Sequence, residues 1–364
     1  MTELNGCKRL NALFDGNTID KLCWSTLVDD HTLRALPEHL QGMSCLEFYR
    51  YIGCDIVQLG GWCLPWELQG CQLVKPGVNV ESFVDESGNN VTQEHTKRGT
   101  LTSKLSKHGH PIEYPVKDIN DLRAFASSWE EAWYEKVDDT DSYAAIERAV
   151  GDDGIVTLFT APSAIPDLLE NVIGIEQFYY LLMDYPDEMD ALIDRMQQAE
   201  HERFRLIAEG PWDMAILVEN TSTRYISPAV YEKYNLHSQH MFVEALHKRG
   251  KKAILHMCGH VRDLLPMIKE TNADGIHALT PPPLGDTPWD LALDVLGNDI
   301  IIFGCLTPDI FQEMPLDEMG TALDRLLTTR LRESRLVICL GADGIAVPVE
   351  RFLAVRDWID SHKK

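Results

Sequence analysis

The sequence lacks several features that identify common classes of protein. It contains no CxxC pair, no GxGxxG or GxxxxGK[ST] loop after a predicted strand, and no apolar run near the roughly 20 residues that span a bilayer. Its first residues, MTELNGCKRL, are polar and contain no apolar signal-peptide core. We therefore expect neither a phosphate-binding loop nor a membrane-spanning helix, and we predict a cytoplasmic protein.

Positive charge is also scarce. The 364 residues include 33 Lys or Arg against 57 Asp or Glu, which gives a formal net charge of −24. Such a surface repels nucleic acids and anionic membranes, so we expect no partner of either kind. The nine cysteines are an odd number in a chain too large to need disulfides, so we expect reduced thiols.

Short apolar runs separated by helical segments make up most of the chain. Runs of this kind are typical of strands buried on both faces, as in a parallel sheet. They lie at residues 54–62, 154–159, 214–220, 252–258, 273–279, 299–306 and 335–343. Because strands and helices alternate along the chain, we predict an α/β fold, namely a (β/α)8 TIM barrel with one strand irregular or hidden, rather than an open doubly wound sheet.

Two segments depart from this alternation. We predict that residues 1–50 form a helical N-terminal segment with turns. Residues 78–117 are polar, alternate in hydropathy and contain the turn sequences SGNN and HGH, which predicts a β-hairpin insertion. His108 and His110 lie in the second turn, and we predict no metal role for them. We treat residues 1–364 as a single domain.

The sequence ILHMCGHV, residues 254–261, is the strongest chemical signal. Side chains two residues apart in a strand point to the same face, so His256 and Cys258 face the same way at the C-terminal end of their strand. In a TIM barrel that end carries the active site. An imidazole and a thiolate there can bind one Zn²⁺. A core histidine beside a buried thiol is the alternative, and a metal site requires a further ligand from another strand end.

Polar side chains also follow the preceding strand. Glu219 is predicted either to act beside His256 as a catalytic base or metal ligand, or only to cap a loop or pair with Arg224. Asn220 and Arg224 are candidate substrate-binding residues.

Two tryptophans follow the strand at residues 54–62. Trp62 and Trp66 are predicted either to wall an apolar substrate pocket at the barrel mouth or to pack under the insertion. His277 lies on a strand whose facing the sequence does not determine.

Three segments resemble the uroporphyrinogen decarboxylase superfamily, and most of all its zinc-dependent, corrinoid-linked methyltransferase branch. They read AILHMCGHVRDLLPMIKETNADGIHAL, IIFGCLTPDIF and LVICLGADGIAVPVERFLAVRDW, and the resemblance extends from about Gly53 to the C-terminus. It implies a TIM barrel. It also implies that His256 and Cys258 bind Zn²⁺, with His256 in the catalytic centre.

The branch has a third zinc-binding cysteine after the last barrel strand, in the sequence GCGI. This chain instead reads GADGI at residues 341–345. Cys339, which lies on the same predicted strand face as Asp343, and Asp343 itself are therefore the two candidates for the third metal ligand. An aspartate would make the site harder and less rich in sulfur.

The resemblance implies a methyltransferase with Zn²⁺ as its metal and a separate corrinoid protein as its partner. The methyl group would move between methylcobalamin, or another corrinoid on that partner, and a small molecule. The small molecule is either a methyl donor, such as a methoxy compound, or a thiol acceptor. A ligand set poor in thiolates favours the donor, and hence an O-demethylase. A homodimer is compatible with the sequence.

Two alternatives stay open. A uroporphyrinogen-type decarboxylase needs arginines to hold a substrate with many carboxylates. The chain lacks the MRQAGR motif of those enzymes and has Gln58 where they have an aspartate. A non-catalytic barrel that binds a tetrapyrrole or a partner protein would keep the His-x-Cys pair only as a remnant.

Overall fold

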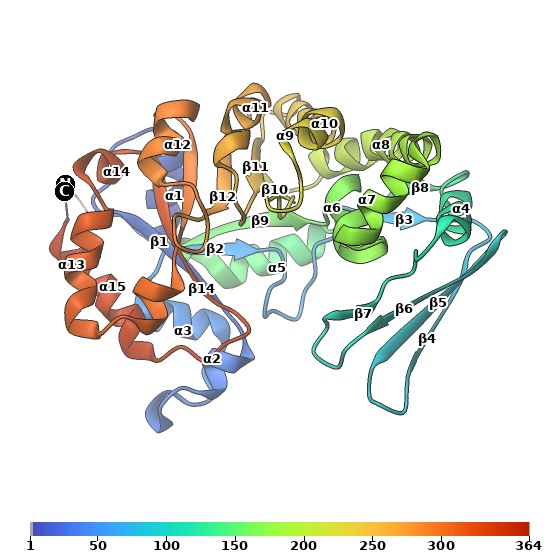
Figure 1. Cartoon of the computed structure of the whole chain (residues 1–364). Coiled ribbons are helices and arrows are strands. Elements are labelled where there is room, and N and C mark those ends of the chain that lie inside the picture. The colour runs from blue at the N-terminus through green and yellow to red at the C-terminus, as the bar shows by residue number, and fades with distance from the viewer. Residues whose placement is uncertain (1–2, 364) are drawn as a thin grey trace.

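The computed structural model describes residues 3–363, and within this range eight parallel strands form a barrel (Figure 1). Around the barrel they follow the order β1 (Cys23–Val28), β14 (Leu336–Ala342), β13 (Ile301–Leu306), β12 (Gly275–Leu279), β11 (Lys252–His256), β10 (Met214–Val218), β9 (Gly154–Thr160) and β2 (Ile56–Leu59). Between β1 and β2, the Asp55 amide donates a hydrogen bond to the Trp24 carbonyl at 2.8 Å. The predicted (β/α)8 barrel is confirmed.

Helices surround the strands and cover their outer faces (Figure 1). They are α5 (Thr140–Val150), α6 (Ala164–Asp167), α7 (Ile175–Asp184), α8 (Pro186–Ala208), α9 (Pro228–Val230), α10 (Leu236–His247), α11 (Leu265–Glu270), α12 (Trp289–Leu296), α13 (Leu316–Leu326), α14 (Thr329–Glu333) and α15 (Val349–Ser361). Short 3₁₀ or π turns lie at Glu38–Leu40, Gly151–Asp153, Leu168–Val172, Tyr231–Asn235, Arg262–Leu264 and Asp309–Glu313. An outer apolar core fills the space between helices and strands, and a smaller inner core fills the barrel.

The N-terminal segment corrects one prediction. It contains α1 (Gly6–Phe14), α2 (Asp30–Arg34) and α3 (Cys45–Ile52), but β1 lies among them and is a strand of the barrel. This strand, CWSTLV, is the one that the apolar pattern did not reveal. Ser25 and Thr26 interrupt its hydropathy because both line a cavity at the barrel mouth.

Helix α1 closes the other end of the barrel. Leu10, Leu13 and Phe14 recur at helical spacing and join the inner core, where the Phe14 ring lies 5.8 Å from that of Phe303. The barrel interior is therefore sealed at its N-terminal end and accessible from the C-terminal ends of the strands.

The predicted insertion is confirmed as an antiparallel sheet that projects from the barrel (Figure 1). Its strands are β4 (Asn79–Val84), β5 (Asn90–Thr96), β6 (Gly99–Leu105) and β7 (Pro111–Glu113). The sheet is anchored where α4 (Ile119–Ser128) packs on β6, and a two-stranded ladder of β3 (Cys71–Val74) and β8 (Trp133–Lys136) lies beside this anchor.

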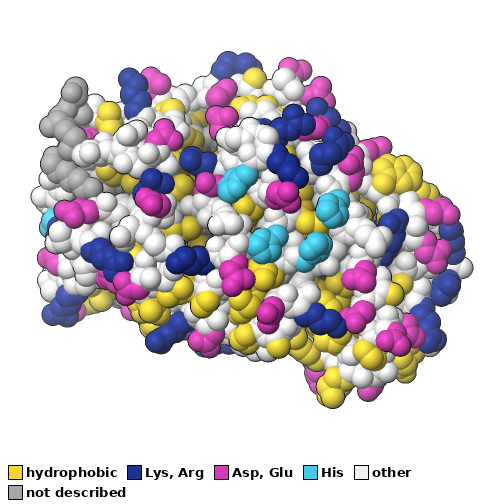
Figure 2. Space-filling view, turned by 90° about the horizontal axis from the view of Figure 1, so that it is seen from above, with side chains coloured by type: hydrophobic (Ala, Val, Ile, Leu, Met, Phe, Trp, Pro, Cys, Tyr) yellow, Lys and Arg dark blue, Asp and Glu magenta, His cyan; other side chains and the backbone are white. Residues whose placement is uncertain are grey.

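Charges of both signs are interspersed on the helical surface. Figure 2 shows Lys and Arg side chains separated by Asp and Glu over the face that forms the top of Figure 1. Many charges of the described residues are paired, as in the 2.6 Å ion pair between Arg249 and Glu209. Within residues 3–363, no helix is both long enough and apolar enough to span a membrane.

Candidate active site at the mouth of the barrel

The inward-facing residues of β11 lead to a cavity at the barrel mouth. Ile254 packs in the inner core, whereas Leu255 and Met257 belong to the outer core. Because side chains alternate along the chain, His256 and Cys258 point inward, and both line the cavity. The structure thus brings together the two residues of the His-x-Cys pair.

This mouth cavity has a volume of about 300 Å³. It is lined by Ser25, Thr26, Leu27, Val57, Leu59, His256, Cys258, His277, Ala278, Cys305, Cys339, Leu340, Gly341 and Asp343. The lining combines imidazoles, thiols and one carboxylate, and among the residues that the structure describes it includes neither Lys nor Arg. Nitrogen and sulfur donors of this kind suit Zn²⁺.

His256 and His277 form a close pair on neighbouring strands. Their Nδ1 atoms lie 2.7 Å apart, so one imidazole donates a hydrogen bond and the other accepts it. Burial lowers the pKa of His256 to about 4, and burial together with His256 holds the pKa of His277 well below its usual value. Both rings are therefore neutral near pH 7, which is the form that ligates a metal.

The cysteines of the cavity are thiols in the absence of metal. Burial raises the pKa of Cys258 and of Cys339, and it raises that of Cys305 to about 11. A bound cation displaces thiol protons, because the thiolate is the ligating form.

The two candidates for the third ligand also line the mouth cavity. Cys339 is half-buried on β14, and Asp343 follows β14 as an exposed residue at the rim. In the arrangement seen for residues 3–363, however, no three His, Cys, Asp or Glu side chains gather closely enough to hold a metal ion. The donor chemistry fits Zn²⁺, and the side chains would have to turn toward a common point to bind it.

Glu219 does not lie in the mouth cavity with His256. It follows the outward-facing Leu217 at a spacing of two, so its side chain lies behind β10. There Gln239 donates a hydrogen bond to its carboxylate at 2.7 Å, and the Ser163 amide donates one at 3.3 Å. Burial raises the pKa of Glu219 to about 7. Among the described residues, Arg224 forms no hydrogen bond or ion pair with the Glu219 carboxylate.

Asn220 and Arg224 occupy the loop after β10. The Asn220 side chain accepts a hydrogen bond from the Cys258 thiol at 3.6 Å and donates one to Glu170 at 3.0 Å, which puts it at the rim of the cavity. Its φ of +41° is unusual for a residue other than glycine, and such strain is common at functional sites. Arg224 is exposed, and its guanidinium has no hydrogen bond or ion pair with any described residue.

The two tryptophans lie beside the mouth cavity rather than in its wall. Trp62 is 38% exposed and donates a hydrogen bond from Nε1 to the Val28 carbonyl, at the end of β1, at 2.8 Å. Trp66 is half-buried and packs against the outer core. Trp62 is therefore available at the rim, whereas Trp66 supports the loop behind it.

The sequence predicts no role for His277 or Cys305, although both line the mouth cavity. Cys305 could have been predicted as a site residue, because it lies near the C-terminal end of a predicted apolar strand. No signal in the sequence indicates which way the His277 side chain points, because the register of β12 shifts between His277 and Leu279.

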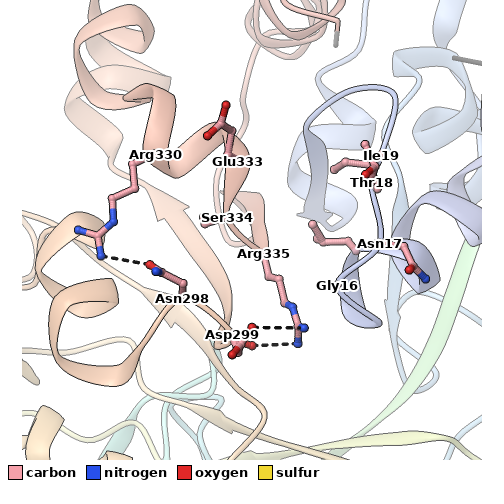
Figure 3. A pocket seen from close by; sticks show the side chains of 11 residues that line it. Gly16, Asn17, Thr18, Ile19, Asn298, Asp299, Arg330, Glu333, Ser334 and Arg335 are labelled. Atoms are coloured by element: carbon pink, nitrogen blue, oxygen red, sulfur yellow. Dashed lines mark hydrogen bonds and ion pairs between the residues drawn. The ribbon is translucent and has the colours of Figure 1, made fainter.

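A second cavity, of about 710 Å³, lies at the opposite end of the barrel, before β1, β13 and β14 (Figure 3). Its arginines are already engaged: Arg330 donates to Asn298 at 3.2 Å, and Arg335 pairs with Asp299 at 3.6 Å. The N-terminal end of a TIM barrel serves stability rather than catalysis. We therefore assign the active site to the mouth cavity.

Several known proteins are similar to this chain in sequence or in fold. A family model described as uroporphyrinogen decarboxylase (URO-D) matches residues 111–361. A solved methyltransferase from Methanosarcina mazei is 15% identical, with a TM-score of 0.60 and 99% of each chain covered. A putative vitamin-B12-independent methionine synthase from Listeria monocytogenes is 14% identical, with a TM-score of 0.37 over 60% of this chain and 67% of that one. No curated protein sequence matches the chain.

Proposed function

Because the chain belongs to the uroporphyrinogen decarboxylase family, whose model matches residues 111–361, we propose that it is a zinc-dependent methyltransferase that works with a corrinoid on a separate protein. The observation that carries this proposal is the set of nitrogen and sulfur donors in the mouth cavity, with His256 and Cys258 side by side. The likeness in fold over the whole chain to a methyltransferase supports it.

The metal would be held by His256 and Cys258, and Cys339 and Asp343 are the candidates from the last strand. When bound, Zn²⁺ supplies a Lewis acid that either lowers the pKa of a thiol substrate or polarises the atom that carries a methyl group. The Asn220 amide at the rim orients the substrate. Phe159, whose ring lies 5.4 Å from that of His256, limits the access of water to the buried side of the cavity.

The sequence predicts a methyl donor, and hence an O-demethylase, because its candidate ligand set is poor in thiolates. Because Cys258, Cys305 and Cys339 all line the mouth cavity, the number of thiols there does not favour a methyl donor over a thiol acceptor. The proposal therefore includes both a methyl donor and a thiol acceptor as substrate, and the assay below distinguishes them.

Decarboxylation of a substrate with many carboxylates is less compatible with this cavity. Such a substrate requires several cations, and the described lining of the cavity contains neither Arg nor Lys. A volume of about 300 Å³ is at the lower end for ligand pockets and suits a small molecule better than a tetrapyrrole. The same two properties argue against a non-catalytic barrel that binds a tetrapyrrole.

The corrinoid protein would cover the open mouth of the barrel. The methyl group must move between the corrinoid and a substrate held beside His256 and Cys258, so the two reacting atoms have to come into contact there. Loops at residues 60–70, 221–225 and 280–286 form the rim, where Trp62 and Arg224 are exposed. These two residues are suited to contact the partner or the substrate at its outer end.

The test is a methyl-transfer assay with purified corrinoid proteins. Zinc-loaded enzyme is mixed with the Co(I) corrinoid protein and a panel of methoxy and methylamine compounds, and formation of methyl-Co(III) is followed by absorbance. The reverse assay starts from methyl-Co(III) and thiol acceptors. Transfer by the wild type that is lost in Cys258→Ser and kept in Cys71→Ser, a cysteine outside the cavity, supports the proposal. Absence of transfer in both directions contradicts it.

A further inference from the structure

We propose that Cys305 of β13 supplies the third protein ligand of the metal and that His277 of β12 holds His256 in its ligating orientation. The inference rests on the zinc site of the proposed function and assigns to it two residues of this chain. The juxtaposition that supports it involves three neighbouring strands, β11, β12 and β13.

Cys258 and Cys305 lie at the same height in the barrel. His256, His277 and Phe303 are paired across β11, β12 and β13. Cys258 lies two residues beyond His256, just after the end of β11, and Cys305 lies two residues beyond Phe303 on β13. Phe303 packs in the inner core, so Cys305 also points inward, and both cysteines line the mouth cavity.

The strand between these two cysteines leaves room for an ion. The β12 register shifts between His277 and Leu279, and Leu279 turns into the outer core. Ala278, with a φ of +60°, lines the cavity in its place. Between Cys258 and Cys305, β12 therefore presents a methyl group rather than a bulky side chain.

Cys305 is better placed than the ligands suggested by the sequence. Cys305 lies directly opposite Cys339 in the pairing of β13 with β14, and only β12 separates β13 from β11, whereas two strands separate β14 from β11. Cys305 therefore lies on a strand nearer to Cys258 than the strand of Cys339. Asp343 is exposed at the rim and offers oxygen, whereas zinc sites with thiolate and imidazole favour a further sulfur or nitrogen.

His277 is placed to fix the ring of His256. A ligating histidine usually donates its second ring N–H to a nearby acceptor, which sets the tautomer. If His256 donates from Nδ1 to Nδ1 of His277, over 2.7 Å, its Nε2 is left for the metal. The His277 ring cannot turn away easily, because Phe159 and Phe303 flank it with ring centres at 6.1 and 5.3 Å.

Cobalt(II) is the probe for the ligand set, because it substitutes for zinc and its thiolate charge-transfer absorption reports the number of sulfur ligands. Metal-free protein is titrated with Co²⁺, and affinity for Zn²⁺ is measured by competition with a chelator. The variants are Cys305→Ser, Cys305→Ala, Cys339→Ser, Asp343→Asn and His277→Phe. Thermal unfolding and circular dichroism show whether each variant is folded.

The proposal predicts one Co²⁺ per chain in the wild type with two thiolate ligands. Both Cys305 variants lose about half of the charge-transfer absorption, whereas Cys339→Ser and Asp343→Asn keep it. His277→Phe keeps the absorption, but its affinity for Zn²⁺ falls about 10–100-fold.

Other outcomes distinguish an error in the assignment of Cys305 or His277 from an error in the zinc site itself. Loss of absorption in Cys339→Ser with none in the Cys305 variants overturns the assignment of Cys305 and places the ligand on the last strand. Unchanged affinity in His277→Phe overturns the role of His277. A wild type that binds neither Co²⁺ nor Zn²⁺ overturns the zinc site itself, and with it the proposed function.

Discussion

His256 is the last residue of β11 and Glu219 directly follows the neighbouring strand β10, yet their side chains lie on opposite sides of the barrel wall. His256 faces the mouth cavity, whereas Glu219 lies behind β10 with Gln239 and Ser163. A shift of one residue along a strand exchanges its two faces. A carboxylate at a strand end is therefore a candidate for catalysis only when it lies an even number of positions from the inward-facing residues of its strand, so that it faces the cavity as they do.

The buried Glu219 should make stability depend on pH. Its pKa is raised from 4.5 to about 7 by burial, so the folded chain binds a proton that the unfolded chain releases in that range. This group's contribution is fully present below pH 4.5 and is lost as the pH rises through 7. From pH 4 to pH 8, the unfolding free energy of Glu219→Gln should rise relative to the wild type by on the order of 3 kcal/mol.

Urea unfolding at a series of pH values measures this difference. Glu67→Gln, at an exposed position, is the matched control and should follow the wild-type profile. A pH profile of Glu219→Gln parallel to that of the wild type would show that the carboxylate titrates normally.

At the scale of single elements, β11 and the turn after it determine the site. Gly259 follows Cys258, and a Cβ there would lie 2.5 Å from both the Ser222 Cβ and the Thr221 carbonyl oxygen. The loop after β10 therefore packs directly on the glycine. This contact holds the Cys258 Sγ atom at 3.6 Å from the Asn220 Oδ1 atom.

Gly259→Ala should push these two loops apart. We expect a loss of about 1–3 kcal/mol in unfolding free energy, as for overpacked sites, and weaker binding of Zn²⁺ because Cys258 moves. Gly320→Ala is the control, because a Cβ in the middle of α13 meets Trp358 only at 3.8 Å and alanine favours a helix. Chemical denaturation and zinc titration give both quantities. Equal stability and zinc affinity of Gly259→Ala and the wild type would contradict this role.

The sequence predicted most strands, because apolar runs buried on both faces are distinctive. It missed β1, since Ser25 and Thr26 face the cavity and break the apolar run. The sequence predicted that His256 and Cys258 face the same way, because side chains two residues apart in a strand share a face. It could not orient His277, because the irregular backbone at Ala278 depends on packing against the neighbouring strands. The role of Cys305 could not be predicted, because it depends on which strands surround the cavity.

At the scale of the whole molecule, α1 and the barrel are joined by buried charges. Arg9 of α1 forms ion pairs with Asp20, at 2.7 Å, and with Asp55, which precedes β2. All three residues are buried. These contacts tie the N-terminal helix to the seam between β1 and β2, where the barrel closes.

Arg9→Met should leave two buried carboxylates without their cationic partner. Removing one member of a buried ion pair costs about 3–5 kcal/mol in unfolding free energy. Arg34→Met is the matched control, since Arg34 and Asp30 form an exposed pair, and pairs of that kind contribute about 0–1 kcal/mol. Circular dichroism during urea unfolding compares the two variants. A similar small loss in both would show that the buried cluster is not needed to hold α1 against the barrel.

The central claim is that the mouth cavity is a zinc site built on His256 and Cys258, and elemental analysis of the purified protein tests it most directly. The wild type and Cys71→Ser should contain about one Zn²⁺ per chain, whereas Cys258→Ala and His256→Ala, if folded, should have lost most of it. Equal zinc in the wild type and in both site variants would contradict the claim.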